Sequence, residues 1–244
     1  MIPVSPIGKK EILRIVICLT VTCLVASVIL GVVYQWTEPA KRTLTAKREA
    51  ELVRELLELK EGAIVLEVKR YLIEGEKPSM GYLLEKEFRL YDLEGNFLKS
   101  LEAPPPESHL IGRFFIAKDP DGNGLGYVTE ASQYGFKSHI RFFVALDTHF
   151  QIRGVEVISH EEDPGLGAEI TKPFFKNQFI GKTREQMRTL RVSKEPMSET
   201  ISPDSPIYAV TGATISSRAL TDGVRKAVEH LSVRLNLILP KGEK

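Results

Sequence analysis

An uninterrupted apolar stretch near the N-terminus limits this chain more than any other feature. Residues 15–34 read IVICLTVTCLVASVILGVVY and contain no charged side chain. As a helix they would measure about 30 Å, the thickness of the hydrocarbon core of a bilayer. A cleaved signal peptide has a shorter apolar region and a small residue before the cleavage site, which Val33-Tyr34-Gln35-Trp36 does not offer. We predict one transmembrane helix over residues 12–35, preceded by a short segment, 1–11.

The distribution of charged residues leaves the orientation of this helix open and gives no sign of a nucleic-acid partner. Basic residues flank the apolar stretch on both sides, so the positive-inside rule does not apply clearly. The formal net charge of +1 excludes the basic surface that nucleic-acid binding requires. Both cysteines, Cys18 and Cys23, lie inside the apolar stretch, which leaves the rest of the chain without a thiolate metal site. Redox chemistry would therefore need a bound cofactor.

A helical segment is expected to follow the membrane, over residues 36–62. Apolar residues recur there at spacings of three and four, with charged residues between them. We expect this helix to end at Gly62 and Pro39 to kink or break its connection to the membrane helix. It is either a stalk or a surface helix of the following domain.

Residues 63–239 read as one domain of the α+β class, with an antiparallel or mixed sheet and covering helices, followed by a tail, 240–244. Short runs rich in β-branched and aromatic residues predict strands, and turn-forming residues separate them. The proline-rich segment EAPPPESH from Glu102 predicts a surface loop. A helical face near the C-terminus should cover the sheet with Leu220, Val224, Ala227, Leu231 and Leu235. The predicted strands are AIVLEVKR, GYLLEKEFRLYD, HIRFFVAL and GVEVISH.

The segment Asp119-Pro-Asp-Gly-Asn-Gly, followed by Glu130, matches the spacing of an EF-hand calcium loop. An EF-hand loop lies between two helices, whereas the flanking runs FFIAK and GYVTEA predict strands. The turn-forming residues explain the segment as a β-hairpin without any metal. We predict no metal site here, nor at His160-Glu161-Glu162, which lacks a second group of ligands at suitable spacing.

Chemistry is expected where TGATISS, from Thr211, enters the last helix. A helix N-terminus presents unpaired N–H groups and the positive end of the helix dipole, which together favour a phosphate. Gly212 and Ala213 leave little bulk beside the Thr214 hydroxyl. Taken alone, an ordinary capping role for a threonine or serine explains these residues better. A second unusual segment, EDPGLG from Glu162, combines a Pro-Gly turn with a following glycine and allows backbone to approach a flat ligand.

From the anchor to the last helix, the chain resembles the RnfG and NqrC family, the FMN-binding subunits of the Rnf and Na⁺-NQR ion-pumping electron-transfer complexes. The pieces that carry the resemblance occur in the same order: the membrane helix, YGFKSHIRFFVAL, EDPGLG, FFKNQFIGK and TGATISS. In that family a flavin transferase takes FMN from FAD and joins it, by a phosphoester bond, to the last threonine of [ST]-G-A-T. The resemblance therefore implies covalent FMN on Thr214, with Gly212 and Ala213 as the uncrowded approach and Thr211 and Ser216 as phosphate or capping neighbours.

The resemblance also assigns the second segment. EDPGLG is similar to the family's ETPGLG, which lies beside the flavin, and Asp163 replaces the family's threonine. Tyr208 stands where the family usually has an aspartate before the TGAT motif, with Asp204 four positions earlier. If the transferase reads that acid, attachment to this chain is inefficient or uses another acidic group. The implied flavin contacts are Glu162, Pro164, Gly165, Leu166 and Gly167.

The resemblance implies an electron-carrier subunit of an ion-translocating oxidoreductase, without substrate turnover of its own. TGATISSRAL and the compact length favour RnfG over NqrC. The N-terminus would be cytoplasmic and the FMN domain would lie on the extracytoplasmic side of the plasma membrane. The implied partners are the other subunits of the complex, the flavin transferase and membrane lipid. The alternatives are a cofactor-free anchored module that binds partner subunits, and a flavin-dependent sensor or reductase outside any pump.

Overall fold

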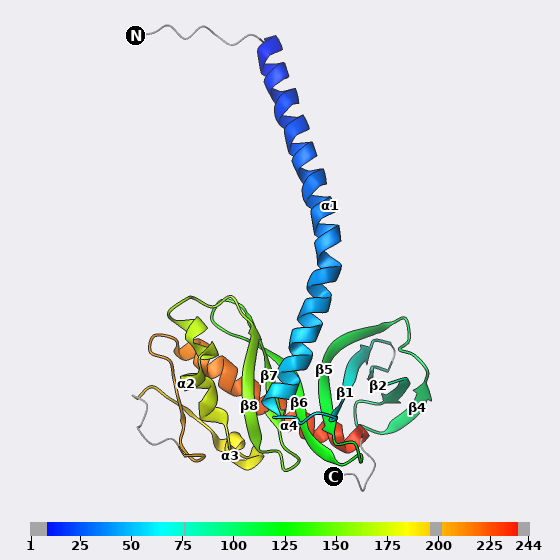
Figure 1. Cartoon of the computed structure of the whole chain (residues 1–244), viewed down its shortest axis with the longest axis vertical. Coiled ribbons are helices and arrows are strands. Elements are labelled where there is room, and N and C mark those ends of the chain that lie inside the picture. The colour runs from blue at the N-terminus through cyan, green and yellow to red at the C-terminus, as the bar shows by residue number, and fades with distance from the viewer. Residues whose placement is uncertain (1–8, 76, 196–201, 239–244) are drawn as a thin grey trace. The chain divides into compact units, whose positions relative to one another are not determined.

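The structure, a computed structural model, describes residues 9–75, 77–195 and 202–238. The chain forms two compact units, 1–52 and 53–244. The predicted tail 240–244 and most of the predicted segment 1–11 lie outside the described residues. A single long helix and a sheet-based domain account for most of the elements (Figure 1).

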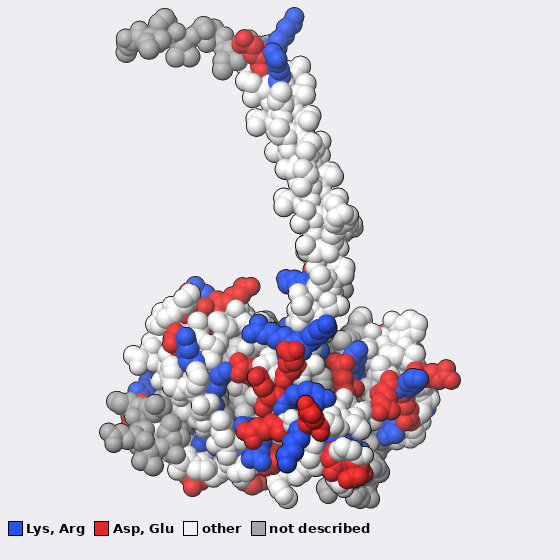
Figure 2. Space-filling view, in the orientation of Figure 1, with Lys and Arg blue, Asp and Glu red and all other residues white. Residues whose placement is uncertain are grey.

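Helix α1 runs from Lys9 to Leu56 and contains the predicted transmembrane stretch. Within the described residues it is the one helix long and apolar enough to cross a membrane. The apolar side chains of residues 15–34 are exposed, and Figure 2 shows this stretch as a continuous uncharged surface. The hydroxyls within it are satisfied by the helix itself, since Thr20 Oγ1 donates to Val16 O at 2.9 Å and Ser27 Oγ donates to Leu24 O at 2.8 Å. Such internal bonding suits a segment surrounded by lipid.

Two expectations about this helix were wrong. Pro39 lies inside α1, which continues through it from Lys9 to Leu56, so the expected break is absent. The helix ends at Leu56 and not at Gly62. Glu58, at φ 50°, takes the left-handed position, and the Leu59 N–H donates to Arg54 O at 3.0 Å. These contacts form a Schellman motif, in which glycine is only the preferred residue.

The domain is built on one eight-stranded sheet in which every neighbouring pair is antiparallel, in the order β4-β3-β2-β1-β5-β6-β7-β8. A separate two-stranded parallel sheet joins β9 and β10. The strands are β1 (Ile64–Ile73), β2 (Ser79–Leu84), β3 (Glu87–Tyr91), β4 (Phe97–Leu101), β5 (Ser108–Lys118), β6 (Gly124–Tyr134), β7 (His139–Leu146), β8 (Ile152–Ser159), β9 (Val192–Ser193) and β10 (Ile207–Tyr208).

The run GYLLEKEFRLYD, predicted as one strand, is a hairpin of β2 and β3. Leu84 pairs with Glu87, so the chain reverses at Glu85 and Lys86, and Glu85 takes a positive φ of 53°. Neither residue is a usual turn former, which is why the sequence hides this turn. The prolines of EAPPPESH lie in the loop between β4 and β5 as predicted, although Ser108 and His109 already belong to β5.

The segment with calcium-loop spacing is the turn of the β5–β6 hairpin, so the predicted flanking strands are confirmed. The Asp119 carboxylate accepts hydrogen bonds from Asn123 N and Asn123 Nδ2, both at 2.8 Å. Asp92 and Asn96 close the β3–β4 turn with the same pair of bonds, at 2.7 and 2.8 Å. The Asp119 carboxylate therefore closes a turn, and the same Asp–Asn arrangement occurs at two turns of the domain.

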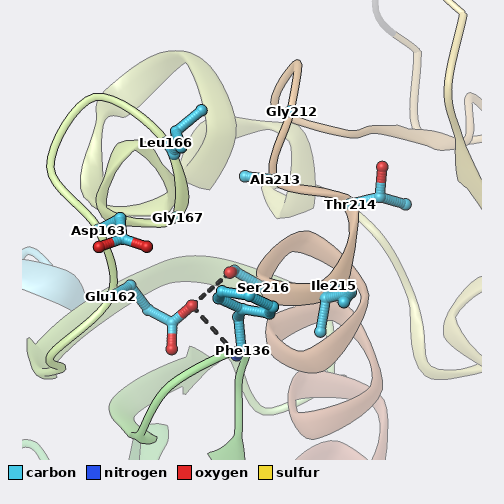
Figure 3. Close-up of a pocket in the computed structure, with 10 residues that line it drawn as sticks. All are labelled: Phe136, Glu162, Asp163, Leu166, Gly167, Gly212, Ala213, Thr214, Ile215 and Ser216. Atoms are coloured by element: carbon cyan, nitrogen blue, oxygen red, sulfur yellow. Dashed lines mark hydrogen bonds between the residues drawn. The ribbon is translucent and has the colours of Figure 1, made fainter.

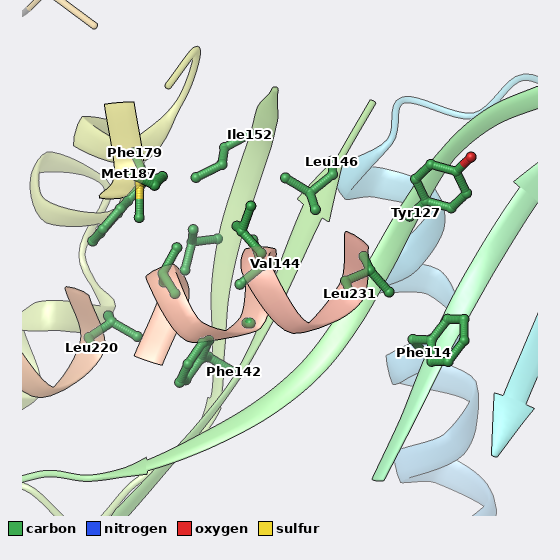
Figure 4. Packing of buried hydrophobic residues seen from close by; sticks show 14 of the residues in the cluster. Phe114, Tyr127, Phe142, Val144, Leu146, Ile152, Phe179, Met187, Leu220 and Leu231 are labelled. Carbon is green, nitrogen blue, oxygen red and sulfur yellow. The ribbon is translucent and has the colours of Figure 1, made fainter. Parts of the chain in front are cut away.

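Helix α4 (Thr214–Ile238) covers one face of the sheet with its predicted apolar side, and this prediction is confirmed. Leu220 and Leu231 pack in one cluster with Phe142 and Val144 of β7 (Figure 4). Helix and sheet approach closely, since a Cβ on Gly223 would lie 2.7 Å from Phe142 Cζ. Short helices complete the cover: η1 (Gly167–Thr171), α2 (Pro173–Lys176), η2 (Asn177–Phe179) and α3 (Arg184–Thr189).

The two ends of α4 meet different parts of the domain. Its first turn belongs to the loop that contains TGAT, whereas its last carbonyls are bound by β3. The Tyr91 hydroxyl donates to Leu237 O at 2.9 Å, and Arg89 Nη1 donates to Ile238 O at 3.1 Å. These bonds satisfy acceptors that a helix C-terminus otherwise leaves unpaired. With 25 residues, α4 extends about 37 Å from one part to the other.

Candidate functional site

A cavity of about 340 Å³ lies between the loop that follows β8 and the start of α4 (Figure 3). It brings together the two segments that the sequence singled out, EDPGLG and TGAT. We call it the first cavity. It is lined by Phe136, Glu162, Asp163, Leu166, Gly167, Gly212, Ala213, Thr214, Ile215 and Ser216.

The remaining predicted residues lie on or near a neighbouring cavity of about 510 Å³, the second cavity. Thr211 and Gly165 line it, together with Phe174, Gln178 and Tyr208 among others. Pro164 is not among the lining residues of either cavity. The chain thus passes from the second cavity at Thr211 to the first at Gly212.

Thr214 is the first residue of α4 and is partly exposed at the edge of the first cavity. Its hydroxyl makes no hydrogen bond to any residue that the structure describes, and the same is true of the Thr211 hydroxyl. The N–H groups of the first helical turn have no acceptor within the helix. A free hydroxyl thus stands beside free N–H groups, an arrangement suited to a phosphate.

The loop before α4 is held by Ser217 rather than by either threonine. Ser217 Oγ accepts from Val210 N at 3.0 Å and donates to Ala213 O at 2.9 Å, and both serine and alanine are buried. Ala213 N in turn donates to Val210 O at 2.9 Å. Ser217, in the first turn of α4, therefore fixes the loop before the helix, and neither the Thr211 nor the Thr214 hydroxyl makes a capping hydrogen bond to a described residue.

Gly212 is required by conformation and by space. Its φ of +78° is left-handed, and a Cβ there would lie 2.9 Å from Leu166 Cδ2. The TGAT loop and the EDPGLG loop therefore touch across the first cavity at this glycine. A larger residue would separate the two walls.

The Glu162 carboxylate holds three segments together. Glu162 is only 4% exposed, so its carboxylate oxygens depend on protein donors. It accepts hydrogen bonds from the backbone N–H groups of Phe136 at 3.1 Å, Lys137 at 3.0 Å and Ser138 at 3.2 Å. The Ser216 hydroxyl donates to the same group (Figure 3). Four protein donors occupy the two oxygens, so Glu162 shapes the floor of the cavity and has little capacity left for the ligand contact expected from the sequence.

Two glycines make room for this carboxylate. A Cβ on Gly135 would lie 2.5 Å from Glu162 Oε1. A Cβ on Gly167 would lie 2.8 Å from both Glu162 Oε2 and Ser216 Oγ. Gly167, predicted as a ligand contact, is thus also required for close packing behind the cavity.

Acid is expected to weaken the domain through Glu162. Burial raises the pKa of this carboxyl, but hydrogen bonds from Ser216 and from three backbone N–H groups outweigh burial and leave the pKa below its usual value. The resulting contribution to the free energy of unfolding is complete above the unfolded-state pKa, about 4.3, and is lost as pH falls through the folded-state pKa. Thermal melts from neutral pH down to about pH 3 should show the difference between wild type and Glu162→Gln closing on acidification. A difference independent of pH would contradict this role.

Asp163, which replaces the family's threonine, also lines the first cavity and pairs with Lys137 Nζ. Tyr208 is the second residue of β10 and lines the second cavity. Asp204, the nearest upstream acid, accepts a hydrogen bond from Gln186 Nε2 at 2.6 Å. Asp204 is therefore engaged in a structural contact with α3.

Sequence reasoning missed two lining residues, Phe136 and Ile215. Both are apolar yet 57% and 56% exposed, respectively, and they present large side chains at the cavity. Phe136 follows Gly135 in the segment YGFKSH, where an aromatic residue in a turn was the available signal. Ile215 lies inside the TGATISS motif, where its position beside Thr214 was the available signal.

The part of the chain that builds this site has known relatives. The FMN-binding domain family matches residues 135–229, which include every lining residue of the first cavity. The G subunit of the ion-translocating oxidoreductase complex of Methanosarcina acetivorans is 26% identical over 93% of this chain and 97% of its own length. The G subunit of the proton-translocating ferredoxin:NAD(+) oxidoreductase complex of Clostridium ljungdahlii is 32% identical over 44% of this chain and 54% of its own length. Among solved structures, NqrC of Shewanella oneidensis aligns with a TM-score of 0.49 and 18% identity, covering 77% of this chain and 99% of that one.

Proposed function

Because the chain belongs to the RnfG/NqrC family of FMN-binding subunits, we propose that it is the electron-carrier subunit of a membrane-anchored, ion-translocating oxidoreductase complex of the Rnf type. Its similarity to the G subunits of two such complexes supports this assignment, and the match to the Methanosarcina protein extends over nearly the whole chain. The first cavity, shared by the two motifs, is the place for the flavin.

We further propose that FMN is attached covalently to Thr214. The observation that carries this proposal is the free Thr214 hydroxyl at the edge of the first cavity, beside the unpaired N–H groups of α4. Gly212, two residues before Thr214, leaves the loop without a side chain where it meets Leu166. When bound, FMN supplies the electron transfer, and the protein holds it in place and tunes it.

Attachment would proceed as a phosphoryl-group transfer from FAD. The Thr214 hydroxyl gives up its proton and forms a bond to the phosphorus of the FMN half. The pyrophosphate bond of FAD breaks, and AMP leaves. The chain contributes the acceptor oxygen and the helix N–H groups that stabilise negative charge, whereas the transferase contributes the remaining catalytic groups.

Helix α1 supports single-pass anchoring in the plasma membrane. We propose a cytoplasmic N-terminus, with residues 63–239 on the extracytoplasmic side. There the domain would exchange electrons with redox centres of neighbouring subunits, without a substrate of its own. Covalent attachment would retain the flavin in a compartment where free FMN is scarce.

Mass spectrometry of the full chain, co-expressed with a flavin transferase and extracted from membranes, tests the attachment. The peptide that contains Thr214 is expected to carry the mass of one FMN less one water. Fragmentation should place the modification on Thr214 rather than on Thr211, Ser216 or Ser217. An unmodified peptide under these conditions would exclude covalent attachment, and the alternative of a cofactor-free module would then be favoured.

A further inference from the structure

The segment that leads into the TGAT loop is held by an unusual contact. Strand β10 pairs with β9 on one side only, where Ile207 N donates to Arg191 O at 3.0 Å and Ala209 N donates to Ser193 O at 2.8 Å. Successive residues of a strand direct their backbone groups to opposite sides. The N–H and C=O of Tyr208 therefore face away from β9, where no other described strand pairs with β10.

The side chain of Gln178 takes the place of the missing strand. Its Oε1 accepts from Tyr208 N at 2.7 Å, and its Nε2 donates to Tyr208 O at 3.2 Å. A carboxamide offers the same donor and acceptor as a peptide group, so it can pair with a single strand residue on both atoms. Gln178 thus completes β10 as a third strand would.

This amide is fixed in place and in orientation. Gln178 is 2% exposed and lies in η2, between Phe175 and Phe179, which are fully buried. Its Nε2 also donates to Phe174 O at 3.3 Å. The nitrogen therefore faces two carbonyl oxygens and the oxygen faces one N–H, which leaves a single consistent orientation of the amide.

From Tyr208, the chain reaches Thr214 through a loop with a second fixed point at Val210, where Ser217 binds the N–H group. Gln178 acts on the first point and Ser217 on the second. Gln178 lines the second cavity and not the first, so it has no contact with the Thr214 hydroxyl. Its effect on that hydroxyl must pass through the backbone.

We propose that Gln178 is a positioning residue for flavin attachment: by binding both backbone atoms of Tyr208, it sets the place of residues 211–214 beside the first cavity. This inference rests on the proposed function, because the group that it positions is the attachment hydroxyl. Gln178 belongs to the segment FFKNQFIGK, for which the sequence alone suggested no function.

Gln178→Glu is the sharpest test because it keeps the shape, replaces the amide donor by an oxygen and adds a negative charge at a buried position. The carboxylate would face the carbonyl oxygens of Tyr208 and Phe174 without a hydrogen to share. Val68→Ala serves as the matched control, since Val68 is fully buried in β1 and far along the chain from the TGAT loop. Both variants are expected to lower Tm, but only the first should disturb the loop.

Attachment is measured on the full chain in detergent with purified transferase and FAD, well below the Tm of every variant. Gln178→Glu is expected to lower kcat about tenfold or more with the KM for FAD unchanged, because a displaced acceptor slows transfer without affecting how the transferase binds FAD. Val68→Ala should keep the wild-type kcat. If wild type is labelled and Gln178→Glu is labelled as fast as Val68→Ala, the inference is wrong. If wild type takes up no flavin, the proposed attachment fails, and this inference with it.

Discussion

Thr214→Ala is expected to give a folded chain that carries no covalent flavin. The substitution removes the single oxygen to which the phosphorus would be joined, so the loss of label should be complete rather than partial. Folding should be little affected, since the hydroxyl makes no hydrogen bond to a described residue and alanine is a good helix former. Flavin fluorescence of the denatured band in a gel measures the label, and a thermal melt checks the fold.

Thr211→Ala is the matched control for this experiment. It removes the same hydroxyl and methyl groups three residues earlier, from a side chain that lines the second cavity. The Thr211→Ala band should fluoresce like wild type, and Thr214→Ser, which keeps a hydroxyl, should retain label. Fluorescence that survives in Thr214→Ala would mean that another residue carries the flavin. A dark wild-type band would favour the cofactor-free module.

Glu162→Ala is expected to destabilise the domain by about 3 kcal/mol, because one buried carboxylate is removed while its four donors remain. For a domain of this size, that loss lowers Tm by roughly 6–12 °C. The backbone at residues 136–138 and the first turn of α4 would lose their common acceptor, so flavin attachment should also fall. Thermal melting and in-gel fluorescence of the same samples measure both effects.

Asp163→Ala provides the comparison, since it removes the adjacent carboxylate from the lining of the same cavity. Its partner Lys137 is half exposed, and an ion pair of this kind contributes roughly 0–1 kcal/mol. If the two alanine variants melted at the same temperature, Glu162 would not have the structural role that its hydrogen bonds indicate.

Much of the architecture could be predicted because it follows from local patterns. The apolar stretch of α1, the strand pattern of β7 and the apolar face of α4 each depend on periodicity within one element. The turn at Glu85 and the helix end at Glu58 could not be found in this way. Both place a glutamate at positive φ, where glycine or asparagine is the preferred residue and so the usual sequence signal.

Only part of the candidate site could be predicted from the sequence. The TGAT and EDPGLG segments stand out by their local chemistry, the resemblance to a family gives them a role, and the structure brings them to one cavity. The partners of their side chains were not predictable, because they come from segments far apart in the sequence. Glu162 binds residues 136–138 and 216, and Gln178 binds Tyr208, thirty positions away. A sequence pattern records that a polar residue is present but not which donor or acceptor it meets.

The contact between α4 and β3 shows that the range matched by the family is shorter than the domain that holds the site together. The family match begins at residue 135, whereas Arg89 and Tyr91, which bind the last carbonyls of α4, lie well before it. A fragment cut at the limits of that match would keep the whole lining of the first cavity. It would nevertheless lose six strands of the sheet, β1 to β6, and the last residues of α4, and with them both sides of the contact that anchors the helix presenting Thr214. The boundary of sequence similarity is therefore the wrong place to divide this protein for expression.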